Sequence, residues 1–221
     1  MQQSVEVVPA ILRKTYEKLE EDWEKVRHGT NHIQVDITDG VFAGDGSFRD
    51  IRRLKQLVES QKTDLHLMVH TPANYVDDVI DLNPARCIFH IEAFEGTGDT
   101  KMVYEKLRSA TQSELSLALN PDSPMIWLEE HLSMIDFVTF LGYMPGFANQ
   151  EIDPRIFNKI AEFRAKNKEA RIAVDGHVDK ETIGYYVKSG ASLLYTNTAI
   201  FGSGEPQENL KQLQLLAEAA L

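Results

Sequence analysis

The sequence predicts one α/β domain of 221 residues folded as a (β/α)8 barrel. Short apolar runs alternate with longer amphipathic segments from end to end, a pattern typical of repeated βα units around a parallel sheet. Eight such cycles fit into the chain, which lies near the lower end of the usual size for this barrel. No shift in composition, low-complexity tract or linker divides the sequence, so we expect a single domain over residues 1–221.

The eight apolar runs are the expected strands. They cover residues 5–9, 33–36, 64–69, 87–91, 115–119, 137–140, 172–174 and 193–196. Helices are expected between them. Thr71-Pro72 and Asp153-Pro154 place a capping side chain before a proline, which predicts two helix starts. Asn83 and Gly190 can turn the chain out of a helix and predict two helix ends.

Composition limits the classes of partner and location. The formal net charge of −11 argues against nucleic acid or an anionic membrane surface, since both need concentrated Lys and Arg. No apolar run reaches the ~20 residues that span a bilayer, and the N-terminus lacks a basic and apolar leader, so we expect a cytoplasmic protein. Cys87 is the only cysteine, which excludes an internal disulfide and predicts a core residue.

Three predicted strands carry side chains suited to chemistry at or near their ends. Asp36 opens the motif Asp36-Ile37-Thr38-Asp39-Gly40, His66 lies within the third strand, and Asp175 follows the seventh. The C-terminal strand ends form the active-site face of a (β/α)8 barrel, so we expect these groups to converge. Two carboxylates from distant strands suit proton transfer between opposite faces of a substrate carbon. With a divalent cation between them, they could also hold a metal that stabilises an enediolate.

The motifs resemble those of the ribulose-phosphate 3-epimerase family along essentially the whole chain. In the family's order and spacing stand Val8-Pro9-Ala10-Ile11-Leu12, Val35-Asp36-Ile37-Thr38-Asp39-Gly40, Leu65-His66-Leu67-Met68, His90-Ile91-Glu92-Ala93, Leu119-Asn120-Pro121, Pro145-Gly146-Phe147, Val174-Asp175-Gly176 and Ala199-Ile200-Phe201-Gly202. The resemblance implies a ribulose-phosphate-binding TIM barrel. It also implies an isomerase that interconverts D-ribulose 5-phosphate and D-xylulose 5-phosphate, or a related ketose phosphate.

The resemblance further implies the roles of individual residues. Asp36 and Asp175 would be the acid and the base, and Met68 would pack beside the enediolate. A divalent cation (zinc, iron, manganese or cobalt) would be held at Gln34, Asp36, His66 and Asp175. Gln34 departs from the family, which has a histidine ligand there. An amide oxygen is a weaker donor to zinc than imidazole nitrogen, so we expect metal binding that is weak, shifted to harder ions or absent.

Other departures lie at the substrate-positioning and phosphate-binding ends of the site. Ala10 stands in place of a serine, and Thr38 in place of a methionine. The phosphate loops change at Gly146-Phe147-Ala148-Asn149-Gln150, at Gly176-His177 and at Asn197-Thr198, each of which replaces a more glycine-rich sequence. Backbone amides can cradle a phosphate beside larger side chains where no positive φ is needed. Because His177, Asn197 and Thr198 add donors, we expect a modified site for a polar anion.

Two classes of function remain open from the sequence. The trio Asp36, His66 and Asp175 favours an active epimerase, because opposed buried carboxylates are costly to desolvate without a metal or a proton. Gln34 and the altered loops favour a barrel that has lost the reaction and binds a metabolite or a partner protein. A sugar-phosphate decarboxylase or synthase is rejected, since that branch carries a lysine at the position of Thr38.

Structural roles stay open for several of these residues. Asp36 and Asp175 could be turn caps, and His66 could be a core histidine. For His90 and Glu92, structural support and direct function are equally compatible with the pattern. Tyr143 could belong to a lid over the ligand or to loop packing. The sequence does not decide the oligomeric state, and a homo-oligomer is compatible with it.

Overall fold

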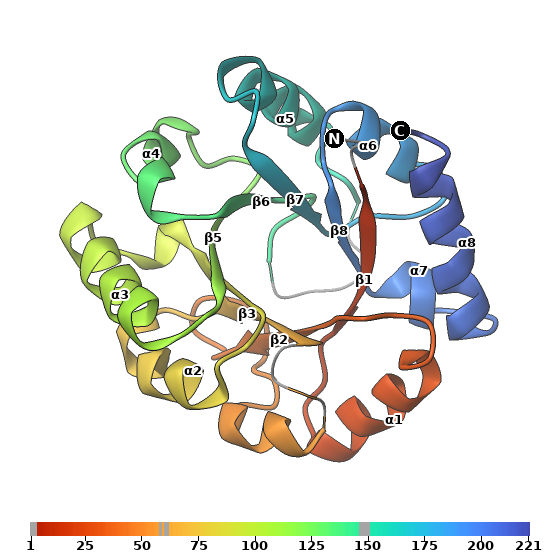
Figure 1. The fold of residues 1–221 in the computed structure, drawn as a ribbon, viewed down its shortest axis with the longest axis horizontal. Helices are drawn as coiled ribbons and strands as arrows, with labels where there is room; N and C mark the ends of the chain where they lie inside the picture. Colours follow the sequence, from red (N-terminus) through yellow and green to blue (C-terminus); the bar gives the residue numbers. More distant parts are fainter. Residues whose placement is uncertain (1–3, 58, 60–61, 146–150) are drawn as a thin grey trace.

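Eight parallel strands close into a barrel in the computed structural model, which describes residues 4–57, 59, 62–145 and 151–221. The strands follow one another around the barrel in sequence order, and β1 pairs with β8 to close it (Figure 1). They are β1 Glu6–Ile11, β2 Ile33–Thr38, β3 Thr63–Met68, β4 Arg86–His90, β5 Glu114–Leu119, β6 Phe137–Leu141, β7 Arg171–Asp175 and β8 Leu193–Thr196. The predicted (β/α)8 barrel is confirmed, with strand ends that differ from the expected ones by at most two residues.

Helices surround the barrel on its outer side (Figure 1). The α-helices are α1 Tyr16–Val26, α2 Val76–Leu82, α3 Thr97–Ala110, α4 Ile126–Glu129, α5 Arg155–Lys166, α6 Ile183–Lys188, α7 Thr198–Phe201 and α8 Pro206–Glu218. Short 3₁₀ helices are η1 Ile51–Gln56, η3 Pro72–Tyr75, η4 Ile91–Ala93 and η5 Leu132–Met134. No helix in the described part of the chain is long and apolar enough to cross a membrane.

Two helix ends follow the expected local chemistry. Asn83 ends α2 with a φ of 51°, and Gly190 follows α6 with a φ of 98°, in the left-handed region that these residue types tolerate. The two predicted helix starts are less regular. Thr71 makes no side-chain capping bond, and α5 begins one residue after the predicted position, at Arg155. Asp153 still accepts a hydrogen bond from the Arg155 N–H at 3.0 Å.

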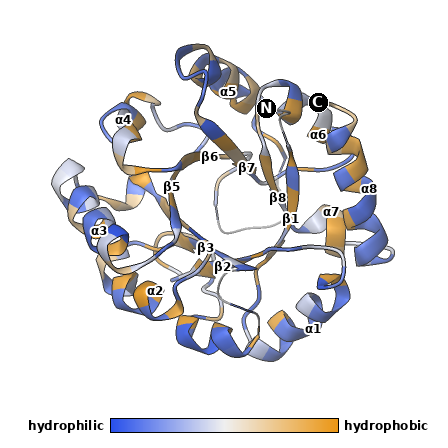
Figure 2. Cartoon of the chain, viewed as in Figure 1, coloured by the Kyte–Doolittle hydropathy of each residue, from blue (hydrophilic) through white to orange (hydrophobic). Residues whose placement is uncertain are grey.

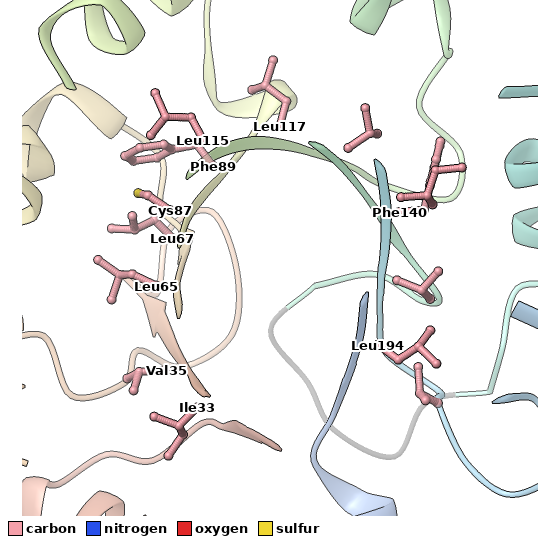
Figure 3. Packing of buried hydrophobic residues seen from close by; sticks show 14 of the residues in the cluster. Ile33, Val35, Leu65, Leu67, Cys87, Phe89, Leu115, Leu117, Phe140 and Leu194 are labelled. Atoms are coloured by element: carbon pink, nitrogen blue, oxygen red, sulfur yellow. The ribbon is translucent and has the colours of Figure 1, made fainter. Parts of the chain in front are cut away.

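Alternation along the strands separates an outer from an inner core. Outward-facing residues such as Leu65, Cys87 and Phe89 are fully buried under the helices, as Figure 3 shows. The polar faces of the helices point to solvent (Figure 2). Each fully buried aliphatic or aromatic side chain contributes about 1.5–3 kcal/mol, so this layer dominates the stability of the barrel. The burial of Cys87 confirms its expected core position.

Inside the barrel, an apolar cluster and a polar cluster share the space. The apolar cluster consists of Val8, Ala10, Ile88, Ala118, Phe137, Leu141, Ala173, Leu193 and Tyr195. The polar cluster is centred on Arg86 at the N-terminal end of β4, whose guanidinium lies 2.7 Å from Asp64, 2.8 Å from Glu6 and 3.4 Å from Glu114. Side chains at this end of the barrel act on stability, because the loops at the opposite end form the ligand-binding face.

Candidate active site

The closed barrel brings Asp36, His66 and Asp175 together at the C-terminal strand ends. Asp36 on β2 lies beside His66 on β3 in the strand register, and Asp175 ends β7. One side-chain ligand atom from each residue lies within 4.8 Å of the other two. His66 is only 1% exposed, and Asp36 and Asp175 are each 9% exposed. Asp36 and Asp175, which are 139 positions apart in the sequence (175 minus 36), therefore belong to one compact and buried cluster.

Gln34 bridges the two carboxylates. Its side-chain nitrogen donates hydrogen bonds to Oδ1 of Asp36 at 2.8 Å and to Oδ2 of Asp175 at 2.7 Å. Nδ1 of His66 lies 2.9 Å from the same Oδ2 of Asp175 and 3.4 Å from the same Oδ1 of Asp36. Two carboxylate oxygens are thus shared by one amide and one imidazole. This arrangement lowers the repulsion between two acidic groups that water barely reaches.

The shared oxygens shift the acidity of the cluster. Burial raises the pKa of Asp36 to about 6, and the charge of Asp175 adds to this effect while contacts with His66 and Gln34 oppose it. Burial by itself would lower the pKa of His66, but the carboxylates of Asp175 and Asp36 outweigh it and raise that pKa to about 9. In this state an imidazolium lies between two acids, so protons can be exchanged among three groups in contact.

The side chains of Asp36, His66 and Asp175 fit a divalent cation, whereas Gln34 fits one only in a different amide orientation. Nδ1 of His66 is buried close to both carboxylates, yet it makes no hydrogen bond of normal geometry within the described residues. Oε1 of Gln34 is likewise buried without a partner there. Two carboxylates and one imidazole are ligands common to zinc, iron, manganese and cobalt sites. Gln34 presents its nitrogen, which cannot ligate a cation, so it fits only if the amide turns to present Oε1.

Two cavities open beside this cluster. The larger has a volume of about 420 Å³, and it is bordered by Asp36, Asp175 and Tyr143 together with Ala10, Glu151, Gly176, His177, Val178, Asp179, Thr196, Asn197, Thr198 and Ala199. A smaller recess of about 80 Å³ is bordered by His66, Met68 and Leu141. Both carboxylates line both spaces, so a ligand that fills the larger cavity would reach them. Tyr143 also lines both spaces.

The loop after β7 is held in an uncommon backbone conformation. His177 has a φ of 53°, and its carbonyl oxygen accepts a hydrogen bond from Oγ1 of Thr182 at 2.6 Å. Nε2 of His177 lies 3.4 Å from Oδ2 of Asp179, whose other oxygen accepts bonds from the backbone of Glu181 and Thr182. A left-handed conformation at a residue other than glycine persists only when its surroundings fix it. These bonds therefore hold the His177 segment against the larger cavity.

The predicted phosphate-end residues are only partly placed by the structure. Ala10, Gly176, His177, Asn197 and Thr198 all border the larger cavity. The side-chain nitrogen of Asn197 is engaged with the Ala10 carbonyl oxygen at 2.6 Å, which ties β8 to β1. The predicted residues Gly146, Phe147, Ala148 and Asn149 lie outside the described residues.

Sequence reasoning did not assign two roles that the structure shows. His90, from β4, places its Nε2 2.9 Å from Nε2 of His66, and the alternation that points Ile88 inward also points His90 inward. Asp39 accepts backbone hydrogen bonds from Val41 and Phe42 at 2.8 Å and from His70 at 2.7 Å, so it joins the loops after β2 and β3. The dipeptide Asp39-Gly40 was the available signal for such a turn.

The comparisons with known proteins agree with this geometry. The model of the ribulose-phosphate 3 epimerase family matches residues 6–201. The chain belongs to this family. A ribulose-phosphate 3-epimerase from Eremothecium gossypii is 28% identical over 223 residues and aligns with 94% of this chain and 91% of its own length. One from Methanocaldococcus jannaschii is 27% identical, covering 98% of this chain and 93% of its own. The rice cytoplasmic isoform is 25% identical, covering 98% and 96%.

Solved structures support the fold independently. A 3-hexulose-6-phosphate synthase from Salmonella typhimurium superimposes with a TM-score of 0.74 at 9% identity, covering 98% of this chain and 100% of that one. Orotidine 5'-monophosphate decarboxylase from Sulfolobus solfataricus gives a TM-score of 0.66 at 12% identity, covering 98% and 99%. At such identities the likeness shows a shared barrel only.

Proposed function

We propose that this chain is a ribulose-phosphate 3-epimerase that interconverts D-ribulose 5-phosphate and D-xylulose 5-phosphate. The observation that carries the proposal is the pair Asp36 and Asp175, which enter the site from β2 and β7 and line the same cavities. Family membership and the near full-length similarity to named epimerases support this assignment. In line with the rice relative, we place the activity in the cytoplasm.

The reaction needs one proton removed from C3 and one returned to the opposite face. One carboxylate takes the C3 proton, the C3–H electron pair forms a C2–C3 double bond, and the carbonyl π electrons move onto the C2 oxygen. The other carboxyl group, in its acid form, then donates a proton to the opposite face of C3 while the carbonyl re-forms. Asp36 and Asp175 exchange these roles with the direction of the reaction, and no net oxidation occurs.

Asp36, His66 and Asp175 would hold a divalent cation, with Gln34 as a fourth ligand through Oε1. Such a cation would supply positive charge that stabilises the enediolate. Two observations support this assignment: Nδ1 of His66 lies against both carboxylates, and Oε1 of Gln34 is buried without a hydrogen-bond partner among the described residues. Because Oε1 and the two carboxylates are oxygen donors, we propose that the site prefers Mn²⁺ or Fe²⁺ over Zn²⁺.

The larger cavity would receive the phosphate end of the substrate. Gly176, His177, Asn197 and Thr198 border it and follow β7 and β8, where this fold commonly binds phosphate. Ala10 lines the cavity with a methyl group and offers no side-chain donor. Met68 and Leu141 border the smaller recess and would exclude water from the reacting carbon.

Solvent exchange at C3 tests the proposal. In D2O, wild-type protein supplied with Mn²⁺ or Fe²⁺ should convert ribulose 5-phosphate into xylulose 5-phosphate that carries deuterium at C3, observed by proton NMR. Asp36→Asn and Asp175→Asn should each abolish the conversion, and because each variant keeps one carboxylate, exchange should survive for at most one of the two ketose phosphates. Conversion that persists in either variant would refute the two-carboxylate assignment.

A second candidate is a barrel that binds a ketose phosphate without epimerising it. The hydrogen bonds from Gln34 to both carboxylates favour it, because they satisfy the pair without a cation. The two candidates differ in one measurement. A binder would show saturable ribulose 5-phosphate binding by calorimetry but no C3 exchange with any of the four metals.

A further inference from the structure

His66 carries a second contact that the epimerisation reaction does not use. Its Nε2 lies 2.9 Å from Nε2 of His90, and the two rings are nearly parallel, with centroids 5.0 Å apart. His90 is 0% exposed, so water does not bond to this pair of nitrogens from outside. A contact of this length between two imidazole nitrogens holds one proton, donated by one ring and accepted by the other.

The contact continues from His90 to Glu92. Nδ1 of His90 lies 3.5 Å from Oε2 of Glu92, and Oε1 of Glu92 accepts a hydrogen bond from the backbone N–H of Asn120 at 2.8 Å. The Asn120 bond holds the carboxylate beside His90. A carboxylate favours a proton on the nitrogen that faces it, so Glu92 favours the Nδ1–H form of His90.

The proton positions along this row depend on one another. If His90 carries its proton on Nδ1, its Nε2 is an acceptor, and Nε2 of His66 must donate. Nδ1 of His66, the nitrogen that faces Asp36 and Asp175, is then the one that gives up its proton when a cation binds. If His90 instead carried its proton on Nε2, His66 would have to accept there and would hold its own proton on Nδ1.

We propose that His90 and Glu92 are positioning residues that hold a proton of His66 on Nε2, which leaves Nδ1, the nitrogen that faces Asp36 and Asp175, as its metal-ligating atom. This inference rests on the proposed function, since it assigns how the protein prepares His66 as a metal ligand. Hydrogen-bonded partners of ligating histidines commonly change metal affinity by about 10- to 100-fold. The same contacts also fix the ring plane of His66. The His66 ring is nearly parallel to that of His90, and the centroid of the His90 ring lies 4.9 Å from that of Phe42.

The first test needs no metal and no variant. Protein labelled with ¹⁵N-histidine gives long-range proton–nitrogen correlations that distinguish the two neutral forms of an imidazole. Metal-free wild type should show His90 as the Nδ1–H form, with Nε2 unprotonated. An Nε2–H form of His90 would overturn the inference.

The second test compares two substitutions at one position. His90→Phe keeps a ring beside Phe42 but removes the acceptor, whereas His90→Gln places an amide oxygen near the position of Nε2. Titration with Co²⁺ should give a 10- to 100-fold larger dissociation constant for His90→Phe than for wild type. For His90→Gln the dissociation constant should change by less than about threefold. Glu92→Gln removes only the charge and should weaken Co²⁺ binding several-fold. This variant tests the inference even if a His90 variant does not fold.

The outcomes separate this inference from the proposed function. Equal Co²⁺ affinity in His90→Phe, His90→Gln and wild type would mean that His90 only fills space, and the inference would fall while C3 exchange by wild type still supported the epimerase. Wild type that shows these Co²⁺ dependences but no C3 exchange would keep the inference and reject the epimerase. Wild type that binds no Co²⁺ at all would overturn the inference even if it were active.

Discussion

Replacing Gln34 with histidine should tighten metal binding. In the structure the Gln34 amide donates to Asp36 and Asp175 at 2.8 and 2.7 Å, and both bonds must break before Oε1 can face a cation. Hydrogen bonds to charged groups contribute about 1.5–3 kcal/mol each, and a cation would recover only part of this through a neutral oxygen ligand. Gln34→His removes that competition and adds a nitrogen donor.

We expect a gain of about 1.4–2.8 kcal/mol in metal binding, which corresponds to a 10- to 100-fold lower dissociation constant. The gain should be larger for Zn²⁺ and Co²⁺ than for Mn²⁺, because imidazole is the softer donor. The assay is competition with a chelator of known affinity, using protein stripped of metal and a fixed pH for both proteins.

Gln34→Met is the matched control, since it keeps a similar length and has no amide. It should destabilise the metal-free protein by about 2–4 kcal/mol, because two buried carboxylates lose their shared donor, and saturating metal should restore most of that loss. A dissociation constant for Gln34→His within twofold of wild type would show that the amide does not compete with the cation. The reasoning on position 34 would then be wrong.

Three further predictions concern other parts of the chain. Asp175→Asn should lower epimerisation by at least ~10²- to 10⁴-fold with an unchanged circular dichroism spectrum, because a general acid–base group is lost. Arg86→Met should lower the free energy of unfolding, measured in urea, by about 3–5 kcal/mol, because it leaves Asp64 buried without its cation. Arg171→Met, at a more exposed ion pair, is the control, and an equal loss in both variants would contradict this prediction. Asp39→Asn should lower the free energy of unfolding by about 1–2 kcal/mol at pH 7, and this difference from wild type should disappear as the pH falls below about 4.

The sign of the Asp39 prediction follows from its surroundings. Burial alone would raise the pKa of Asp39, but backbone N–H groups of His70, Phe42 and Val41 lower it below its ordinary value of 3.8. A carboxylate with a lowered pKa stabilises the folded state above its unfolded pKa, and this contribution disappears as the pH falls through the folded value. A gap between the two proteins that widened on acidification would contradict this account.

The fold could be predicted from the sequence because its signals are local and repeated. Each strand is a short apolar run, and barrel topology then requires the ends of β2, β3 and β7 to meet at one face. The gathering of Asp36, His66 and Asp175 follows from that requirement alone. Cys87 was placed in the core for the same reason, since it stands within an apolar run.

The details of the site could not be predicted, because they depend on how side chains orient after the barrel closes. Gln34 was recognised as a departure from the family, but a sequence does not say which end of an amide faces a carboxylate. The contact of His66 with His90 depends on the register of β3 with β4 and on two ring orientations. Such short-range contacts set the proton positions, and the periodicity of the sequence does not predict them.

Deuterium incorporation at C3 of ribulose 5-phosphate tests the central claim most directly, because it observes the bond that Asp36 and Asp175 are proposed to break and re-form. Wild type should incorporate deuterium at C3 of both ketose phosphates in D2O with added Mn²⁺, whereas Asp175→Asn should not interconvert them and should exchange the C3 proton of at most one. Complete retention of the C3 proton by wild type with each of Mn²⁺, Fe²⁺, Co²⁺ and Zn²⁺ would contradict the account.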